Sequence, residues 1–217
     1  AVSALELKRQ LGVSYKTAWS IKHKLLQTML LREAQRRLDG RVEVDDAYLG
    51  GERPGKRGRG AASKTPFVAA IQTNSEGKPL YIRLTPVAGF TYEALKQWSA
   101  ECLSSTARVV SDGLGCFGAV THTAAQHERH IVGSGKSAVQ RAEFRWVNTL
   151  LGNLKTAFSG TYHAFNHAKY AQRYLAEFSY RFNRRFDLAA MVPRLLRAAA
   201  TTEPLPIGIL RISEIGN

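Results

Sequence analysis

The chain has 217 residues, 44% of them hydrophobic, which is enough for a buried core of ordinary size. Lysine and arginine total 31 against 17 acidic residues, and the net charge of +14 indicates a polyanionic partner, either nucleic acid or an anionic membrane. The sequence contains no run of 18 apolar residues, which argues against a membrane-spanning helix. The cations are spread along the chain rather than along one amphipathic helix, which favours nucleic acid.

Residues 3–30 predict two helices joined by a tight turn. Gly12 lies where the turn needs a residue free of Cβ strain, and Ser14 is a suitable N-cap for the second helix. The pattern is typical of a helix-turn-helix region, which we assign to residues 1–40; an ordinary helical hairpin with a solvated basic face is the alternative. Side chains of the second helix that we expect to face outward and contact DNA are Lys16, Thr17, Lys22 and Lys24.

From residue 41 the periodicity becomes that of strands. Residues 41–51 alternate with period two, and the apolar runs 65–72 and 79–87 are joined by NSEGK, which predicts a hairpin. The Gly-rich segment 51–64 carries a cluster of cations: Lys56, Arg57 and Arg59. We interpret this segment as an arm that lies along DNA phosphates; a solvated hairpin tip is the alternative.

The rest of the chain alternates between helices and short strands. Residues 91–103 predict a helix, and 106–112 and 129–133 predict strands. Further helices are expected at 139–159, 167–183 and 187–200, followed by an irregular tail over 201–217. This order predicts an α/β domain over residues 41–200, with a mixed sheet and flanking helices. No Gly-rich phosphate loop of the P-loop or dinucleotide type occurs.

Two aspartates lie where strands could deliver them to a metal site. Asp45 belongs to the first predicted strand, and Asp112 ends the fourth. Buried carboxylates need cations, and two divalent ions roughly 3.5–4 Å apart would neutralise the pair and activate a water for attack on a phosphodiester. Oxygen ligands of this kind suit Mg²⁺. Taken singly, each aspartate is equally compatible with a solvated turn.

Asn148 and Lys155 complete the candidate site from one predicted helix. Thirty-five residues separate Asp112 from Asn148, and Lys155 follows seven residues later, on the same helix face and roughly 10 Å along the axis. Glu143 points roughly 140° away on a continuous helix, so Asn148 is the preferred third ligand. Lys155 is then suited to hold a DNA phosphate or base beside the scissile bond.

A family resemblance is carried by four stretches: VEVDDAYLGG, KRGRGAASKTPFVAA, VVSDG and FRWVNTLLGNLKTAFSGTYHAFNHAKYAQRYLAEFSYRFNRRFDL. They resemble bacterial insertion-sequence transposases of the DDE class, most of all the branch with a D-D-N-K or D-D-E-K signature. The resemblance covers about residues 3–200 and implies a ribonuclease H-like fold, two Mg²⁺ or Mn²⁺ ions, and cutting and joining of transposon ends. By position it assigns metal binding to Asp45, Asp112 and Asn148, and DNA positioning to Lys155.

The chain departs from that family pattern in two respects. The zinc ribbon that precedes the helix-turn-helix is missing, and the sequence starts at Ala1 without an initiator methionine, so we expect a fragment. The third ligand is an amide, which brings no negative charge to hold the second ion. We therefore expect weaker binding of that ion, or compensation by Glu43 or Asp46. Glu43 shares the strand face of Asp45 by alternation, whereas Asp46 does not.

The resemblance implies double-stranded DNA as partner, both transposon ends and target, and a homodimer or larger assembly on DNA. It also implies location in the bacterial cytoplasm, in association with the nucleoid, which fits two isolated cysteines without a disulfide framework. Two alternatives stay open: a catalytically inactive DNA-binding regulator and a structure-selective nuclease that never joins strands. Four histidines have either structural or site roles: His122, His127, His130 and His163.

Overall fold

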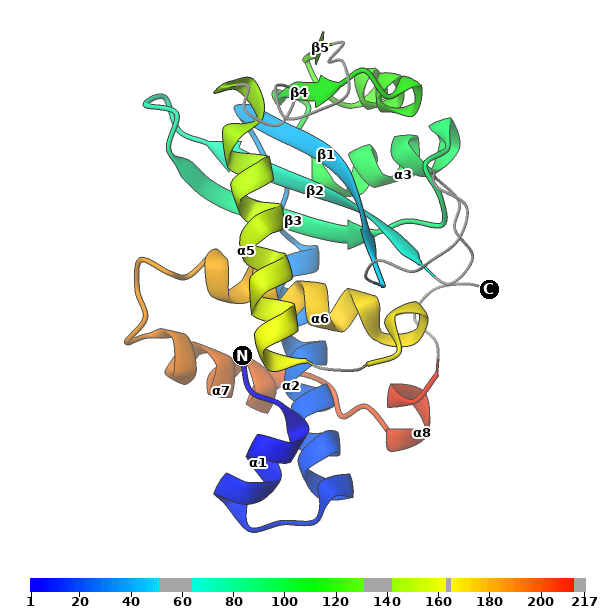
Figure 1. Cartoon of the computed structure of the whole chain (residues 1–217). Helices are drawn as coiled ribbons and strands as arrows, with labels where there is room; N and C mark the ends of the chain where they lie inside the picture. Colours follow the sequence, from blue (N-terminus) through cyan, green and yellow to red (C-terminus); the bar gives the residue numbers. More distant parts are fainter. Residues whose placement is uncertain (51–63, 131–141, 163–164, 213–217) are drawn as a thin grey trace.

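The computed structural model describes residues 1–50, 64–130, 142–162 and 165–212. Its centre is a sheet of five strands in the order β3-β2-β1-β4-β5. The pairs β1–β2 and β2–β3 are antiparallel, and the pairs β1–β4 and β4–β5 are parallel. This mixed sheet with flanking helices confirms the predicted α/β, ribonuclease H-like fold (Figure 1). The strands are β1 Arg41–Leu49, β2 Thr65–Thr73, β3 Pro79–Pro86, β4 Arg108–Asp112 and β5 Gln126–His130.

Strand β5 differs from its prediction. It spans residues 126–130 rather than 129–133, and residues 131–133 lie outside the described part of the chain. In its register Arg108 pairs with Gln126 and Asp112 with His130. The side chains of β5 are exposed or half-buried. Because the strand has no buried face, hydrophobicity could not locate it in the sequence.

The helices follow the predicted order with shifted ends. Helix α2 ends at Ala34, and Leu38 then bridges to Leu103 beside the sheet. The tail, which was expected to be irregular, contains a short helix whose Leu210 is fully buried. The helices are α1 Ala4–Leu11, α2 Tyr15–Ala34, α3 Tyr92–Cys102, α5 Arg145–Thr161, α6 His167–Phe182, α7 Met191–Thr201 and α8 Ile207–Leu210, with 3₁₀ segments η1 Gly115–His122 and η2 Ala142–Phe144.

The turn between the first two helices forms as predicted. Gly12 adopts a left-handed conformation with φ +65°, which a residue with a Cβ adopts only at a cost. The Ser14 side chain then accepts a hydrogen bond from the Thr17 backbone N–H at 3.1 Å. Whether this helical pair acts as a DNA-binding helix-turn-helix stays a prediction.

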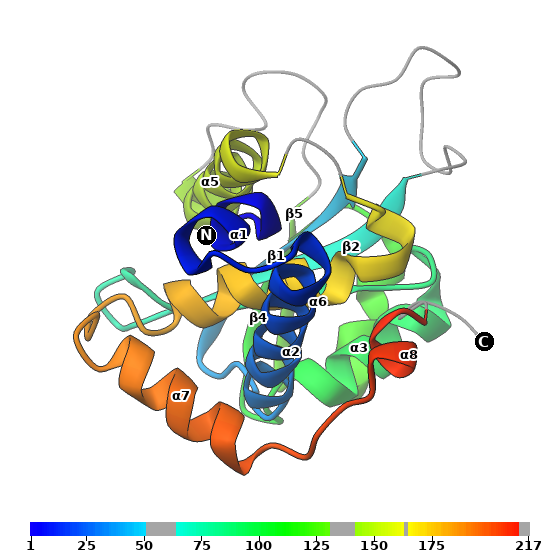
Figure 2. The ribbon, with the colours of Figure 1, turned by 90° about the horizontal axis from the view of Figure 1, so that it is seen from below.

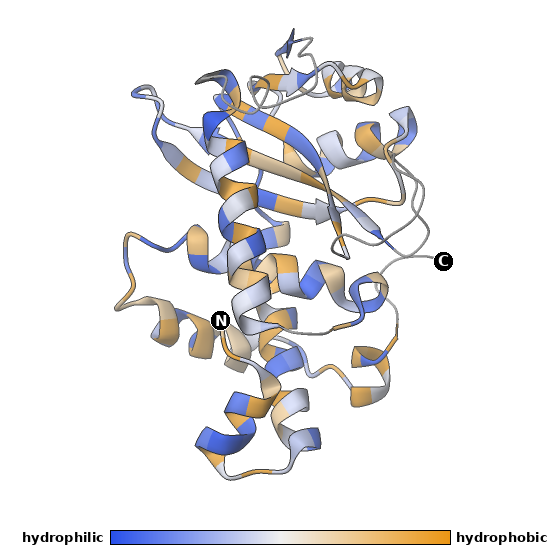
Figure 3. Cartoon of the chain, in the orientation of Figure 1, coloured by the Kyte–Doolittle hydropathy of each residue, from blue (hydrophilic) through white to orange (hydrophobic). Residues whose placement is uncertain are grey.

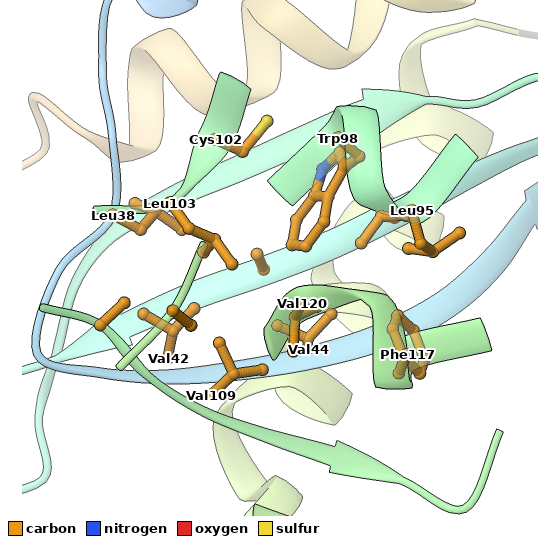
Figure 4. Packing of buried hydrophobic residues seen from close by; sticks show 14 of the residues in the cluster. Leu38, Val42, Val44, Leu95, Trp98, Cys102, Leu103, Val109, Phe117 and Val120 are labelled. Carbon is orange, nitrogen blue, oxygen red and sulfur yellow. The ribbon is translucent and has the colours of Figure 1, made fainter. Parts of the chain in front are cut away.

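Hydrophobic clusters cover both faces of the sheet. On one face Val42, Val44 and Val109 pack beneath Trp98 of α3 and Phe117 of η1 (Figure 4). On the other face the sheet packs against α5 and α6, and α5 alternates buried apolar residues with exposed polar ones along its length (Figure 3). Since β1 and β4 are covered on both faces, polar side chains of these strands can gather where the pairing between them ends.

The C-terminal helices surround α2. Helices α6, α7 and α8 all contact it (Figure 2). Arg173 of α6 joins two of these elements, since Nε donates to Gln27 at 2.9 Å and Nη1 donates to the Leu210 carbonyl at 2.7 Å. The later part of α2 therefore packs with the helices of the predicted catalytic domain, and the boundary at residue 40 stays a prediction. No described helix is both long and apolar enough to cross a bilayer.

Hydrogen bonds of the Asn183 side chain connect the end of α6 to the edge strand β3. The side-chain oxygen accepts the Ile82 N–H at 2.8 Å, and the amide nitrogen donates to the Ile82 carbonyl at 3.0 Å. The same amide donates to Glu33 of α2 at 2.6 Å. One buried side chain thus satisfies the backbone of an edge strand and ties two helices to it.

Replacing Asn183 by alanine removes these three hydrogen bonds and leaves buried groups of Ile82 without a partner. We expect Asn183→Ala to lower the free energy of unfolding by about 1–3 kcal/mol or more. Urea unfolding followed by circular dichroism measures the effect. Asn153→Ala, at an exposed position of α5, is the matched control and should leave stability nearly unchanged. Equal stability of the two variants would contradict this role of Asn183.

Candidate active site

Asp45 and Asp112 are neighbours where the pairing of two parallel strands ends, with Asp45 in the middle of β1 and Asp112 at the end of β4. The last residue pair in the β1–β4 register is Val44 with Ser111, and the two aspartates come next on their strands. Adjacent strands lie about 4.8 Å apart, and side chains at matching positions point to the same face. The register therefore brings together the two acids that the sequence predicted as partners.

Asp46 joins these two aspartates. One carboxylate oxygen from each of Asp45, Asp46 and Asp112 lies within 4.8 Å of the others, and all three residues are half-buried. This corrects the expectation from strict alternation that Asp46 points away. Three negative groups so close together repel unless a cation lies between them. Their oxygens are the donors that Mg²⁺ and Mn²⁺ prefer, so the residues present fit a divalent ion.

Backbone hydrogen bonds orient two of the three carboxylates. Asp45 Oδ1 accepts the N–H of Asp46 at 2.8 Å, and Asp112 Oδ1 accepts the N–H of Leu114 at 3.0 Å. The second bond fixes Asp112 at the start of the loop that follows β4. Beyond Ser111 and Val44, β4 no longer pairs with β1, and the acidic cluster occupies this end of the ladder.

Glu43 ties β1 to the start of α5. Phe144, the N-cap residue of α5, offers no side-chain hydrogen bond to the helix. The Glu43 carboxylate takes that role, because Oε2 accepts the N–H groups of Trp146 at 2.9 Å and Val147 at 3.0 Å. Its other oxygen pairs with Arg41 at 2.6 Å. A negative charge at a helix N-terminus is favourable, and burial to 1% exposure strengthens it.

This anchoring corrects the expectation that Glu43 compensates for the missing third acid. The carboxylate of Glu43 faces α5 and holds two backbone N–H groups and one guanidinium. It is not part of the acidic cluster, whereas Asp46 is. Of the two candidates for compensation, only Asp46 lies beside Asp45 and Asp112.

Asn148 and Lys155 lie on α5, as the sequence predicted. Asn148 follows Val147, whose N–H bonds Glu43, and Glu43 precedes Asp45 on β1 by two residues. Asn148 is half-buried and Lys155 is exposed. The role of Asn148 as a metal ligand and the role of Lys155 on DNA stay predictions.

A groove of about 510 Å³ lies between β1 and α5, and we call it the β1–α5 groove. Ala47, two residues after Asp45, lines it at one side, and Lys155 lines it from α5. Lys64 adds a second cation. The groove therefore begins close to the acidic cluster and offers positive charge to a backbone phosphate. It continues to Tyr162 and Phe165, near the start of α6.

The predicted DNA contacts on α2 fall into two groups. Lys16, Thr17 and Lys24 are exposed, as expected for residues that contact a ligand. Lys22 corrects the prediction, because it is only 5% exposed. Its Nζ donates to the Val2 carbonyl at 2.7 Å and lies 3.9 Å from the centre of the Tyr162 ring. Burial lowers the pKa of Lys22 to about 8. The arm residues Lys56, Arg57 and Arg59 lie outside the described part of the chain.

The histidines have partners of their own. His122 pairs with Tyr92 at 3.0 Å, His127 with Ser111 at 2.8 Å, and His130 with Glu128 at 2.7 Å. Burial lowers the pKa of His127, which favours its neutral form beside β4. These contacts favour structural roles for the three residues. His163 lies outside the described residues.

Comparisons with known proteins give one clear family match. The model of the ISXO2-like transposase domain matches residues 37–183. No curated protein matches the chain in sequence. Among solved structures, the Mos1 strand transfer complex is similar at 14% identity, with a TM-score of 0.40 over 95% of this chain and 75% of the other. The Mos1 mariner paired-end complex with Mn gives 11% identity and a TM-score of 0.28, over 94% and 76% of the two chains.

The anchoring role of Glu43 is testable apart from metal binding. Glu43→Gln replaces a charged acceptor of two N–H groups by a neutral one, and we expect a loss of about 1–3 kcal/mol in the free energy of unfolding. Glu76→Gln, at an exposed surface ion pair, should have little effect. Calorimetric titration with Mn²⁺ should give the same affinity for folded Glu43→Gln as for the unchanged chain. A large loss of Mn²⁺ affinity would instead make Glu43 a ligand.

Proposed function

The chain belongs to the family of ISXO2-like transposases, and from this premise we propose that it cuts DNA at insertion-sequence ends and joins the freed 3′-hydroxyl to target DNA in a metal-dependent reaction. One observation carries the proposal. Asp45 and Asp46 in the middle of β1 converge with Asp112 at the end of β4, beside the helix that bears Asn148 and Lys155. Such a cluster of oxygen donors next to a basic groove suits phosphodiester chemistry.

In this proposal the acidic cluster holds Mg²⁺ or Mn²⁺, two ions in the active complex. Asp45 and Asp112 bind the ions, and the amide oxygen of Asn148 is a neutral third ligand. Asp46 supplies the negative charge that Asn148 lacks. Divalent ions held by these residues would lower the pKa of a coordinated water and stabilise charge on the phosphodiester oxygens.

The protein side chains position the DNA strand. Lys155 holds a phosphate next to the scissile bond, and Lys64 neutralises a neighbouring one in the β1–α5 groove. The Glu43 anchor keeps α5 fixed on β1, so that Asn148 and the aspartates keep a constant separation as DNA binds. Such preorganisation lowers the cost of reaching the reactive geometry.

Recognition of DNA extends beyond the groove. The net charge of +14 supports binding to double-stranded DNA, and the exposed Lys16, Thr17 and Lys24 are candidates for contacts from α2. The sequence adds Lys56, Arg57 and Arg59 as a phosphate-binding arm. Joining two transposon ends calls for at least two copies, so a homodimer or larger complex on DNA belongs to the proposal.

One observation favours a second candidate. The neutral Asn148 at the third ligand position is compatible with a catalytically inactive DNA-binding regulator. A strand-transfer assay with end-sequence DNA and Mg²⁺ or Mn²⁺ separates the possibilities. Joined product supports the transposase, cleavage without joining supports a nuclease, and binding without either supports the regulator.

The two central aspartates give the first prediction for this reaction. Asp45→Asn and Asp112→Asn should each reduce metal-dependent cleavage by more than the roughly 10–100-fold that loss of an outer-shell partner costs. Asp187→Asn, at an exposed ion pair with Arg194, is the control and should retain activity. Gel assays of labelled end-sequence DNA measure the rates. Cleavage that survives in both active-site variants would refute the assignment.

Asp46 and Asn148 give a second prediction through metal binding alone. Asp46→Asn should weaken Mn²⁺ binding in calorimetric titration, because the cluster loses a negative charge. Adding Asn148→Asp to that variant should restore part of the affinity, since the charge returns at the proposed third-ligand position. If Asp46→Asn binds Mn²⁺ as tightly as the unchanged chain, Asp46 does not compensate for the amide.

A further inference from the structure

A second groove, which we call the aromatic groove, lies between the first two helices and the start of α6. It has a volume of about 820 Å³. Its lining is rich in aromatic rings: Tyr15, Trp19, Tyr162, Phe165, Tyr170 and Tyr174. Tyr162 and Phe165 also line the β1–α5 groove, so the two grooves share a wall. Helix α2 packs against α6, and residues of α1 and of the end of α5 line the groove beside them.

Trp19 forms a supported aromatic platform. Its ring stacks on His23 with centroids 4.0 Å apart and planes at 25°, and Tyr170 packs edge-on at 6.0 Å. His23 is fully buried, and burial lowers its pKa to about 3. The imidazole stacked on Trp19 is therefore neutral at physiological pH. Neither ring nitrogen of His23 has a hydrogen-bond partner within the described residues. The imidazole beneath Trp19 thus holds one donor and one acceptor that the described residues leave without a partner.

Cations surround this platform. Arg9 lines the aromatic groove itself, whereas Lys22 in its wall is buried and bound to the Val2 carbonyl and the Tyr162 ring. An adjoining hollow of about 470 Å³ shares Tyr15, Trp19 and Tyr170 with it, and the cations there are Lys16, Lys169 and Arg211. Among the described residues that line the two hollows, the acidic one is Glu6, which pairs with Arg9 at 3.7 Å. Flat rings among positive charges suit a ligand that has both flat rings and negative charges.

We propose that the aromatic groove binds unpaired nucleotides of a DNA strand, with bases stacked on Trp19 and Tyr15 and phosphates held by the surrounding cations. This inference rests on the proposed function, because it places the unpaired stretch next to the strand that Lys155 positions. Unpaired DNA fits better than duplex, since base faces are available for stacking only when the strand is single. It fits better than a protein segment, because positive charge predominates around the rings.

The test measures DNA binding without divalent ions, so that it is independent of cleavage. Fluorescence anisotropy compares a labelled oligothymidylate of about 12 nucleotides, a length within the range of stacking sites, with a blunt duplex. The variants are Tyr15→Ala and Trp19→Leu. Tyr15 is 49% exposed, so its truncation spares the fold even if Trp19→Leu does not. The matched control is Tyr92→Ala, a 50% exposed tyrosine on α3.

We expect Tyr15→Ala and Trp19→Leu to weaken oligothymidylate binding by about 5-fold or more each, the low end for loss of one stacked base. Duplex binding and the Tyr92→Ala control should change far less. Trp19→Phe, which keeps an aromatic face, should retain most of the affinity. Oligothymidylate should also quench tryptophan emission of the unchanged chain, and the quenching should be largely lost in Trp19→Phe.

Three results would overturn the proposal. The first is that the wild-type chain does not bind oligothymidylate. The second is that neither Tyr15→Ala nor Trp19→Leu loses affinity for it. The third is an equal loss for duplex and single strand, which would make the groove a duplex site. Failure of the proposed function looks different: metal-dependent cleavage of end-sequence DNA would be absent while the binding pattern above stays intact.

Discussion

The geometry of the candidate site depends on the hydrogen bonds between the Glu43 carboxylate and the start of α5. This buried carboxylate belongs to β1, two residues before Asp45, yet it caps α5, which starts about a hundred residues later in the chain. Arg41 stabilises the negative charge of Glu43 and also donates to the Glu143 carbonyl at 2.9 Å. Strand β1 therefore contacts both η2 and the start of α5. Because a buried carboxylate with good donors is costly to disrupt, this contact fixes the strand that carries an acid to the helix that carries Asn148.

The charge of the site is distributed differently from the D-D-E pattern. In the proposed site the amide of Asn148 takes the third position, and Asp46 stands beside Asp45. A cluster of three carboxylates keeps the negative charge that divalent ions need, although its third member comes from β1 rather than from α5. Under the proposed function, the strand supplies through Asp46 the negative charge that the amide of the helix does not.

Lys22 and the rings around it connect the N-terminal helices to this framework. Instead of contacting DNA, Lys22 lies against Tyr162 and Tyr174, where Tyr162 also donates to Glu177. A cation against aromatic faces is stabilising, more so when desolvated. The contact fixes the start of α2 beside the end of α5, and the exposed basic residues of α2 are held in a constant position relative to Lys155. The two grooves meet at the same tyrosine.

The sequence by itself determined the order of strands and helices, Asp45 and Asp112 as a pair, and Asn148 and Lys155 on one helix face, because periodicity and spacing are local properties. It could not determine the location of β5, whose side chains are never buried, or the burial of Lys22, which resembles its solvent-facing neighbours. Nor could the alternation of side chains along the strand decide whether Glu43 or Asp46 joins Asp45 and Asp112. Glu43 became a helix cap and Asp46 joined the acids only because β4 ends beside Val44 and α5 packs onto β1, and such contacts between distant segments exist only in the folded chain.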